Sequence, residues 1–100
     1  MLTSYSLTDV PANLDSVHNY YEHMVINEIH QQLGAKTVGT DFIADVACVA
    51  LNHLPPRYIR YDVDMAFYLS PNESMEMEEK VASAVRAALE FVSKRGNRSL

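Results

Sequence analysis

The chain has 100 residues, a formal net charge of -5, 48% hydrophobic residues and a single cysteine, Cys48. This length suits one small domain, and the hydrophobic content excludes a disordered chain. A lone cysteine allows neither an internal disulfide nor a CxxC zinc pair, and the acidic balance disfavours non-specific nucleic-acid binding.

Residues 1–12 are polar without a clear period, and we expect them to form a tail before a single domain at 13–96. Asn13 or Asp15 is expected to cap the first helix. Gly34 is expected to end it, because glycine adopts the left-handed conformation without penalty. Apolar residues recur between these points at helical spacing: Leu14, Val17, Tyr21, Met24, Val25, Ile29 and Leu33.

The second predicted helix is capped by Thr40 or Asp41 and runs to about Asn52 or Leu54. The double proline at 55–56 stops it, because the residue before a proline avoids the helical region. Apolar residues lie nearly all round this helix, so we expect it to be buried on both sides. In so small a domain, a second subunit or a ligand would supply the second cover.

The segment 57–69 is rich in aromatic and β-branched residues and predicts one strand, or a hairpin turning near 62–64. A capping-box pattern at 70–73 starts the third helix, with a second start signal at Ser74. Gly96 is expected to end it, leaving 97–100 as a C-terminal tail. The sequence therefore predicts a mostly α (α+β) domain, with three main helices around a central buried helix and a short strand or hairpin after the Pro-Pro turn.

No compact set of metal ligands and no nucleophile–base pair is visible in the sequence, so we expect neither a metal site nor an enzyme. Cys48 lies mid-helix among small apolar residues and is interpreted as a packing residue. Residues 1–5 lack a signal-peptide pattern, and no apolar stretch is long enough to span a bilayer. These features predict a cytoplasmic protein.

Two groups of polar residues could bind an anionic ligand through the second helix. Lys36 and Thr37 lie in a glycine-bearing loop that leads into a helix N-terminus, where free N–H groups bind anions. A plain solvated connector is the alternative. Asp45 and Asn52 are seven residues apart and share one helical face. Asp45 could accept hydrogen bonds from a guanine edge, or both side chains could bond neighbouring parts of the chain.

The segment Arg57-Tyr58-Ile59-Arg60-Tyr61 follows the double proline directly. Guanidinium groups bind phosphate bidentately, stack on bases and read a guanine edge, while tyrosine offers a stacking face and a hydroxyl. An exposed sheet whose charges protect its edge is the alternative interpretation.

The run from Tyr20 to Val92 resembles the late-competence ComFB-like family, which is found in cyanobacteria and some firmicutes. The most specific part of the resemblance is the pattern ALNxLPPxY at 50–58. The matching residues are Glu22, Val25, Glu28 and Ile29, then Asp45-Val46-Ala47, Ala50-Leu51-Asn52, Leu54-Pro55-Pro56 and Tyr58, and finally Ala84, Ala88 and Val92.

The resemblance implies a small, mostly helical, homodimeric domain with a short sheet. Cyanobacterial members are cytoplasmic, non-enzymatic receptors for cyclic dinucleotides, cyclic di-GMP above all, and pass the signal to protein partners. Some firmicute members hold zinc through cysteines that this chain lacks.

Residue chemistry and the resemblance together predict a receptor for cyclic di-GMP, with cyclic di-AMP as the second candidate ligand and a transcription regulator as an example of a protein partner. A ligand-free protein–protein adaptor and a DNA-binding competence factor are the alternatives. The predicted ligand-binding residues are Lys36, Thr37, Asp45, Asn52, Arg57, Tyr58, Arg60 and Tyr61.

Overall fold

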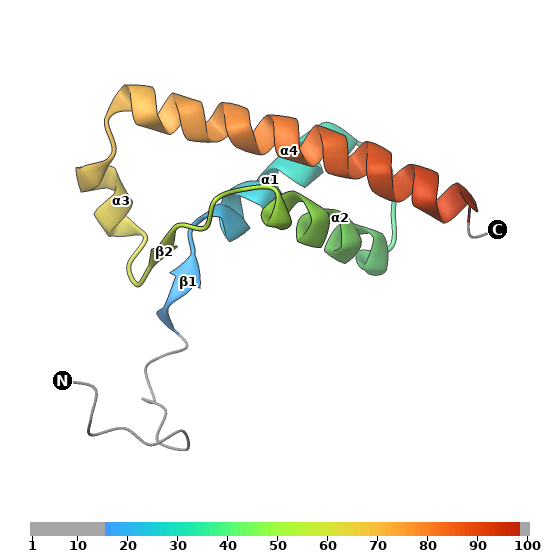
Figure 1. Ribbon diagram of the computed structural model, residues 1–100, viewed down its shortest axis with the longest axis horizontal. Helices are drawn as coiled ribbons and strands as arrows, with labels where there is room; N and C mark the ends of the chain where they lie inside the picture. Colours follow the sequence, from blue (N-terminus) through green and yellow to red (C-terminus); the bar gives the residue numbers. More distant parts are fainter. Residues whose placement is uncertain (1–15, 99–100) are drawn as a thin grey trace, which may run out of the picture.

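The computed structural model describes residues 16–98, and this part of the chain is mostly helical, as predicted (Figure 1). Two very short strands accompany the helices and form one antiparallel sheet. In chain order the elements are β1 (His18–Asn19), α1 (Tyr21–Leu33), α2 (Thr40–Asn52), β2 (Tyr58–Ile59), α3 (Val63–Tyr68) and α4 (Pro71–Arg98).

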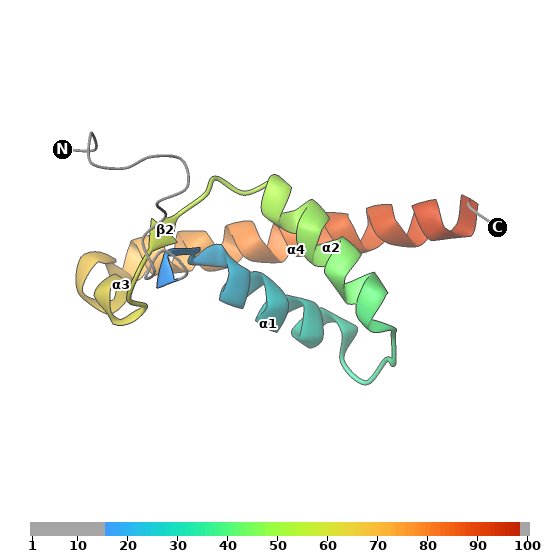
Figure 2. The ribbon, with the colours of Figure 1, turned by 90° about the horizontal axis from the view of Figure 1, so that it is seen from below.

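The core lies where α1, α2 and α4 meet. Helices α1 and α2 form a hairpin against one side of the much longer α4 (Figures 1 and 2). Each helix contributes side chains spaced three or four residues apart, which therefore lie on one face. The buried residues are Tyr21, Val25 and Ile29 of α1, Val46, Ala47 and Ala50 of α2, Leu54 after it, Met65 of α3, and Met77, Val81, Val85, Ala88 and Val92 of α4. The buried residues of α1 all belong to the apolar helical face that the sequence predicted.

Helix α2 is central but not enclosed within one chain. It packs against α1 and α4, while Asp45, Cys48 and Asn52 are exposed. The expectation that a second subunit or a ligand covers the other side of α2 stays a prediction, whereas the prediction of Cys48 as a packing residue is wrong. The physical reason is that two neighbouring helices cover only part of the circumference of a third.

The first helix begins later than its apolar period indicated. His18 pairs with Ile59 and Asn19 with Tyr58, so the backbone before Tyr21 is extended and belongs to the sheet. Val17, predicted on the apolar helical face, is exposed. The predicted caps Asn13 and Asp15, the apolar Leu14 and the tail 1–12 lie outside the described residues.

The segment after the double proline is only partly a strand. β2 covers two residues, and its partner is β1 rather than a neighbouring strand of the same segment. The expected hairpin turn at 62–64 is instead the start of α3, which buries Met65 and exposes Phe67 and Tyr68. Pairing with β1 provides hydrogen-bond partners for the backbone of β2, so β2 does not need a second strand from its own segment.

Two of the predicted helix boundaries are confirmed by their local geometry. Gly34 follows α1 with φ +62° and ψ -125°, a positive-φ conformation outside the left-handed helical region, and its N–H donates to the carbonyl of His30. Ser70 and Glu73 form the predicted capping box, with Glu73 N donating to Ser70 Oγ at 3.1 Å and Ser70 N to Glu73 Oε1 at 2.9 Å.

Two other boundary predictions are wrong. Gly39 is the N-cap of α2, and no side chain caps this end. Thr40 and Asp41 are already its first helical residues. Gly96 lies inside α4, which continues to Arg98, because a glycine inside a helix costs only about 1 kcal/mol relative to alanine. Among the described residues, no helix combines the length and hydropathy needed to cross a membrane.

We expect Gly34→Ala to lower the free energy of unfolding by about 1–3 kcal/mol, because its positive φ and strongly negative ψ are strained for a residue with a Cβ. Gly39→Ala is the matched control, since Gly39 has φ -71° and an added Cβ at either glycine would meet no atom within 4 Å. Urea denaturation of both variants measures the difference. Equal destabilisation by the two substitutions would contradict this account of Gly34.

Candidate functional site

The side chain of Asn19 fixes the start of the arginine–tyrosine segment. Its Oδ1 accepts a hydrogen bond from Arg57 N at 3.0 Å and another from Tyr21 N at 3.2 Å. The backbone adds a third bond, in which Tyr20 N donates to Arg57 O at 2.7 Å. The chain leaving the Pro-Pro turn is thereby tied to the start of α1, which holds β2 beside β1.

The residues after Arg57 present cationic and aromatic groups at the surface. Tyr58 and Tyr61 are 65% and 55% exposed. Arg60 Nε donates to Ser16 Oγ at 2.9 Å, and its guanidinium lies 5.0 Å from the centre of the Tyr61 ring. This distance is within the range of a cation–π interaction. The segment therefore offers positive charge and flat rings together, on a backbone anchored by Asn19.

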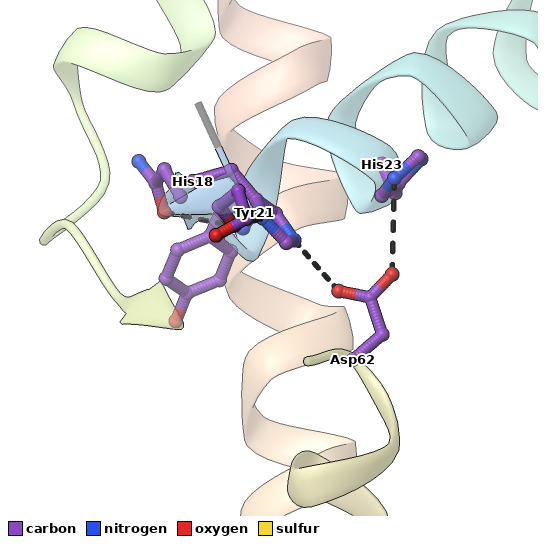
Figure 3. A network of polar contacts seen from close by, with 6 residues as sticks. His18, Tyr21, His23 and Asp62 are labelled. Atoms are coloured by element: carbon purple, nitrogen blue, oxygen red, sulfur yellow. Dashed lines mark hydrogen bonds and ion pairs between the residues drawn. The ribbon is translucent and has the colours of Figure 1, made fainter. Parts of the chain in front are cut away.

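A polar network beside this segment joins β1 and α1 to Asp62 (Figure 3). His18 Nε2 lies 2.7 Å from Asp62 Oδ1, and His23 Nε2 of α1 lies 3.9 Å from Asp62 Oδ2. His18 Nδ1 is 2.9 Å from the backbone carbonyl oxygen of Ser16. The network connects β1 and the start of α1 to the residue that precedes α3.

The surroundings of His18 favour its charged form. Both ring nitrogens face acceptors, and only the imidazolium donates from both nitrogens at once. The hydrogen bond to the Ser16 carbonyl, followed by the bond to Asp62, raises the pKa of His18 above its ordinary value of 6.5. The charge of Glu22 acts in the same direction. No group of three or more His, Cys, Asp or Glu side chains within 16–98 could hold a metal ion.

The structure brings together only part of the predicted binding site. Lys36 and Thr37 precede α2, whereas the arginine–tyrosine segment follows it (Figure 2). A 13-residue helix is about 20 Å long, so the two groups lie at opposite ends of α2. Asp45 and Asn52 share an exposed face, as their spacing predicted. Asn52 Nδ2 is 3.7 Å from Cys48 Sγ and does not bond the Pro-Pro turn.

A small cavity beside Arg57 carries both signs of charge. It measures about 210 Å³ and is lined by Arg57 and Lys80 together with Glu73 and Glu76. The capping bonds from Ser70 lower the pKa of Glu73, and the charge of Arg57 acts in the same direction. Pockets for drug-sized ligands usually measure about 300–1,000 Å³. A cyclic dinucleotide would therefore need a further surface beyond this cavity.

The sequence reasoning missed His18, Asn19 and Asp62 as parts of the site. Their partners lie 38 or 44 residues away in the chain, as in the bonds from Asn19 to Arg57 and from His18 to Asp62. Asparagine near the start of a helix is a known start signal, and Asn19 lies just before the N-cap residue Tyr20. The apolar period, however, placed the helix start further upstream.

The fold and the exposed segment define a small helical domain with an anchored cationic and aromatic surface. The family model described as late competence development protein ComFB matches residues 18–96, and the chain belongs to this family. No curated protein and no solved structure matches the chain at a significant level.

We expect Asp62→Asn to lower the pKa of His18 and Asp64→Asn to leave it unchanged, as measured by NMR titration. Because the folded-state pKa of His18 lies above 6.5, its stabilising contribution is present below pH 6.5 and is lost as the pH rises through the folded value. Asp62→Asn should therefore weaken the dependence of unfolding on pH in this window. The bond to Ser16 should still hold the pKa of His18 above its ordinary value in Asp62→Asn. A His18 pKa that is the same in Asp62→Asn as in the wild type would contradict the network.

Proposed function

We propose that this protein is a non-enzymatic receptor that binds a cyclic dinucleotide as a homodimer and signals through a protein partner such as a transcription regulator. Cyclic di-GMP is the first candidate ligand and cyclic di-AMP the second. The observation that carries the proposal is the anchored, exposed segment from Arg57 to Tyr61. Membership of the ComFB family supports it, because the family resemblance implies such receptors.

The chemistry of the segment suits a ligand of this class. Cyclic dinucleotides carry two phosphates and two flat bases, which match guanidinium groups and tyrosine rings. The Asn19 and Tyr20 bonds hold the backbone at Arg57 before any ligand arrives, and such preorganisation reduces the entropic cost of binding. The ligand would still have to order the side chains of the exposed tyrosines.

The symmetry of the ligand supports a homodimer. Cyclic di-GMP has a two-fold axis, and two copies of the chain related by a two-fold axis would present two identical arginine–tyrosine segments. Within one chain, the cavity beside Arg57 is small and carries both signs of charge. Lys36 and Thr37, at the far end of α2, would contribute only if the second copy brought them to the ligand.

We expect Arg60→Ala to weaken cyclic di-GMP binding about tenfold or more, because a hydrogen bond to a charged group contributes about 1.5–3 kcal/mol. Isothermal titration calorimetry measures the affinity. Arg86→Ala is the matched control, because Arg86 is an exposed arginine on α4 outside the segment. Equal affinities of the wild type and Arg60→Ala would remove Arg60 from the site.

A protein–protein adaptor that needs no ligand is the second candidate function. The observation that favours it is the exposed apolar surface of α3, where Val63, Phe67 and Tyr68 are 62%, 80% and 74% exposed. A DNA-binding role is disfavoured by the net charge of -5.

Thermal denaturation with increasing cyclic di-GMP or cyclic di-AMP separates the two candidates. A receptor should show a melting temperature that rises with ligand concentration, because the ligand binds only the folded state. A constant melting temperature at millimolar concentrations of both nucleotides would favour the adaptor. Linear dinucleotide appearing in the same mixtures would contradict the absence of enzymatic activity.

A further inference from the structure

An open groove runs between the end of α2 and the middle of α4. Its volume is about 1110 Å³, and its walls include Val49 and Leu54 on one side and Ala84 and Ala88 on the other. Phe91 lines the groove and is 47% exposed. Large apolar hollows of this kind on a small domain mark places where another surface packs.

One straight stripe of exposed residues on α4 lines the groove with its first four members, Glu76 to Ala87, and continues beyond it to Lys94. The stripe repeats with alternating steps of four and three residues, which is the spacing of a helix that packs along another helix. The side chains at its centre are small, so a second helix can approach closely. The members are Glu76, Lys80, Ser83, Ala87, Glu90 and Lys94, all exposed.

The order of charges along this stripe is complementary to the same order read in the opposite direction. When two copies of α4 lie antiparallel with Val85 at the centre, Glu76 faces Lys94 and Lys80 faces Glu90, while Ser83 faces Ala87. Each contact then occurs twice, as a two-fold symmetric interface requires. In a parallel, in-register pair, each charge would face its own like charge. The charge pattern therefore selects the antiparallel arrangement.

We propose that the groove between α2 and α4 is occupied by α4 of a second copy of this chain, in an antiparallel two-fold interface. Glu76 and Lys94 pair between copies at both ends of the interface, and Ser83 and Ala87 pack at its centre. The α2 side of the groove supplies Val49 and Leu54 against the incoming helix. This inference rests on the homodimer of the proposed function and names the surface that forms it.

The ends of the stripe cannot contact each other within one chain. Glu76 and Lys94 are 18 positions apart on a continuous helix, a separation of about 27 Å. Lys94 Nζ lies 3.2 Å from Glu90 Oε1 of its own helix. This ion pair is exposed, and in the dimer Lys94 would also contact Glu76 of the second copy. Any energetic coupling between positions 76 and 94 therefore arises between copies.

The test is sedimentation equilibrium of the full chain without nucleotide, over a range of protein concentrations. We expect the wild type to be a dimer, and Glu76→Lys and Lys94→Glu each to weaken association about tenfold or more, because each places like charges together twice. The double variant should recover to within about threefold of the wild type, because the pairs are restored with exchanged signs. Circular dichroism checks that every variant is folded.

Ala87→Glu and Ala44→Glu provide the matched pair of controls. Both replace an exposed helical alanine, but Ala87 lines the groove and Ala44 lies on α2 outside it. Only Ala87→Glu should give a monomer. A dimer that persists in Ala87→Glu would place the interface elsewhere and overturn the inference. So would a double variant that associates no more tightly than Glu76→Lys and Lys94→Glu alone.

Cyclic di-GMP titrations of the same variants separate this inference from the proposed function. A charge-swapped dimer with no affinity for the nucleotide would contradict the receptor and leave the interface standing. A wild type that binds cyclic di-GMP and remains a monomer at all concentrations would overturn the interface and leave nucleotide binding standing.

Discussion

The hydrogen bonds accepted by the side chain of Asn19 are the constraint on which the arrangement of the site depends. The helical core is complete without them, since α1, α2 and α4 bury their own apolar faces. The residues directly after the double proline, Arg57 and Tyr58, are exposed and have no such packing to hold them. Asn19 holds Arg57 and Tyr21 through one oxygen atom and so joins the chain after the Pro-Pro turn to the start of α1.

A single chain leaves several surfaces without a complementary neighbour. α2 exposes Asp45, Cys48 and Asn52, the groove along α4 is open, and the aromatic side chains of α3 and β2 lie at the surface. A domain of this size cannot cover so much apolar area by itself. Glu76 and Lys80 belong both to the α4 stripe and to the small cavity beside Arg57. Tyr58, Arg60 and Tyr61 lie outside the stripe, so a dimer through α4 leaves them available to a ligand.

The distribution of charge matters more here than its sum. The net charge of -5 argues against binding of a polyanion across the whole surface of the protein. The arginines of the segment 57–61 are nevertheless concentrated beside two exposed tyrosines. Along α4 the acidic residues gather toward the N-terminus and the basic residues toward the C-terminus, which suits the helix dipole. The same gradient makes the helix complementary to an antiparallel copy of itself.

The sequence by itself determined the features that depend on neighbouring residues. The apolar faces of α1 and α4, the stop at 55–56, the capping box at Ser70 and the positive φ of Gly34 follow from spacing and from local backbone chemistry. Only the tertiary structure decided the pairing of β1 with β2, the bond from His18 to Asp62, the separation of Lys36 from Arg57 and the exposure of the polar face of α2. The physical reason is distance along the chain: a turn or cap is set within a few residues, whereas a contact between residues some 40 positions apart depends on how the helices have already packed.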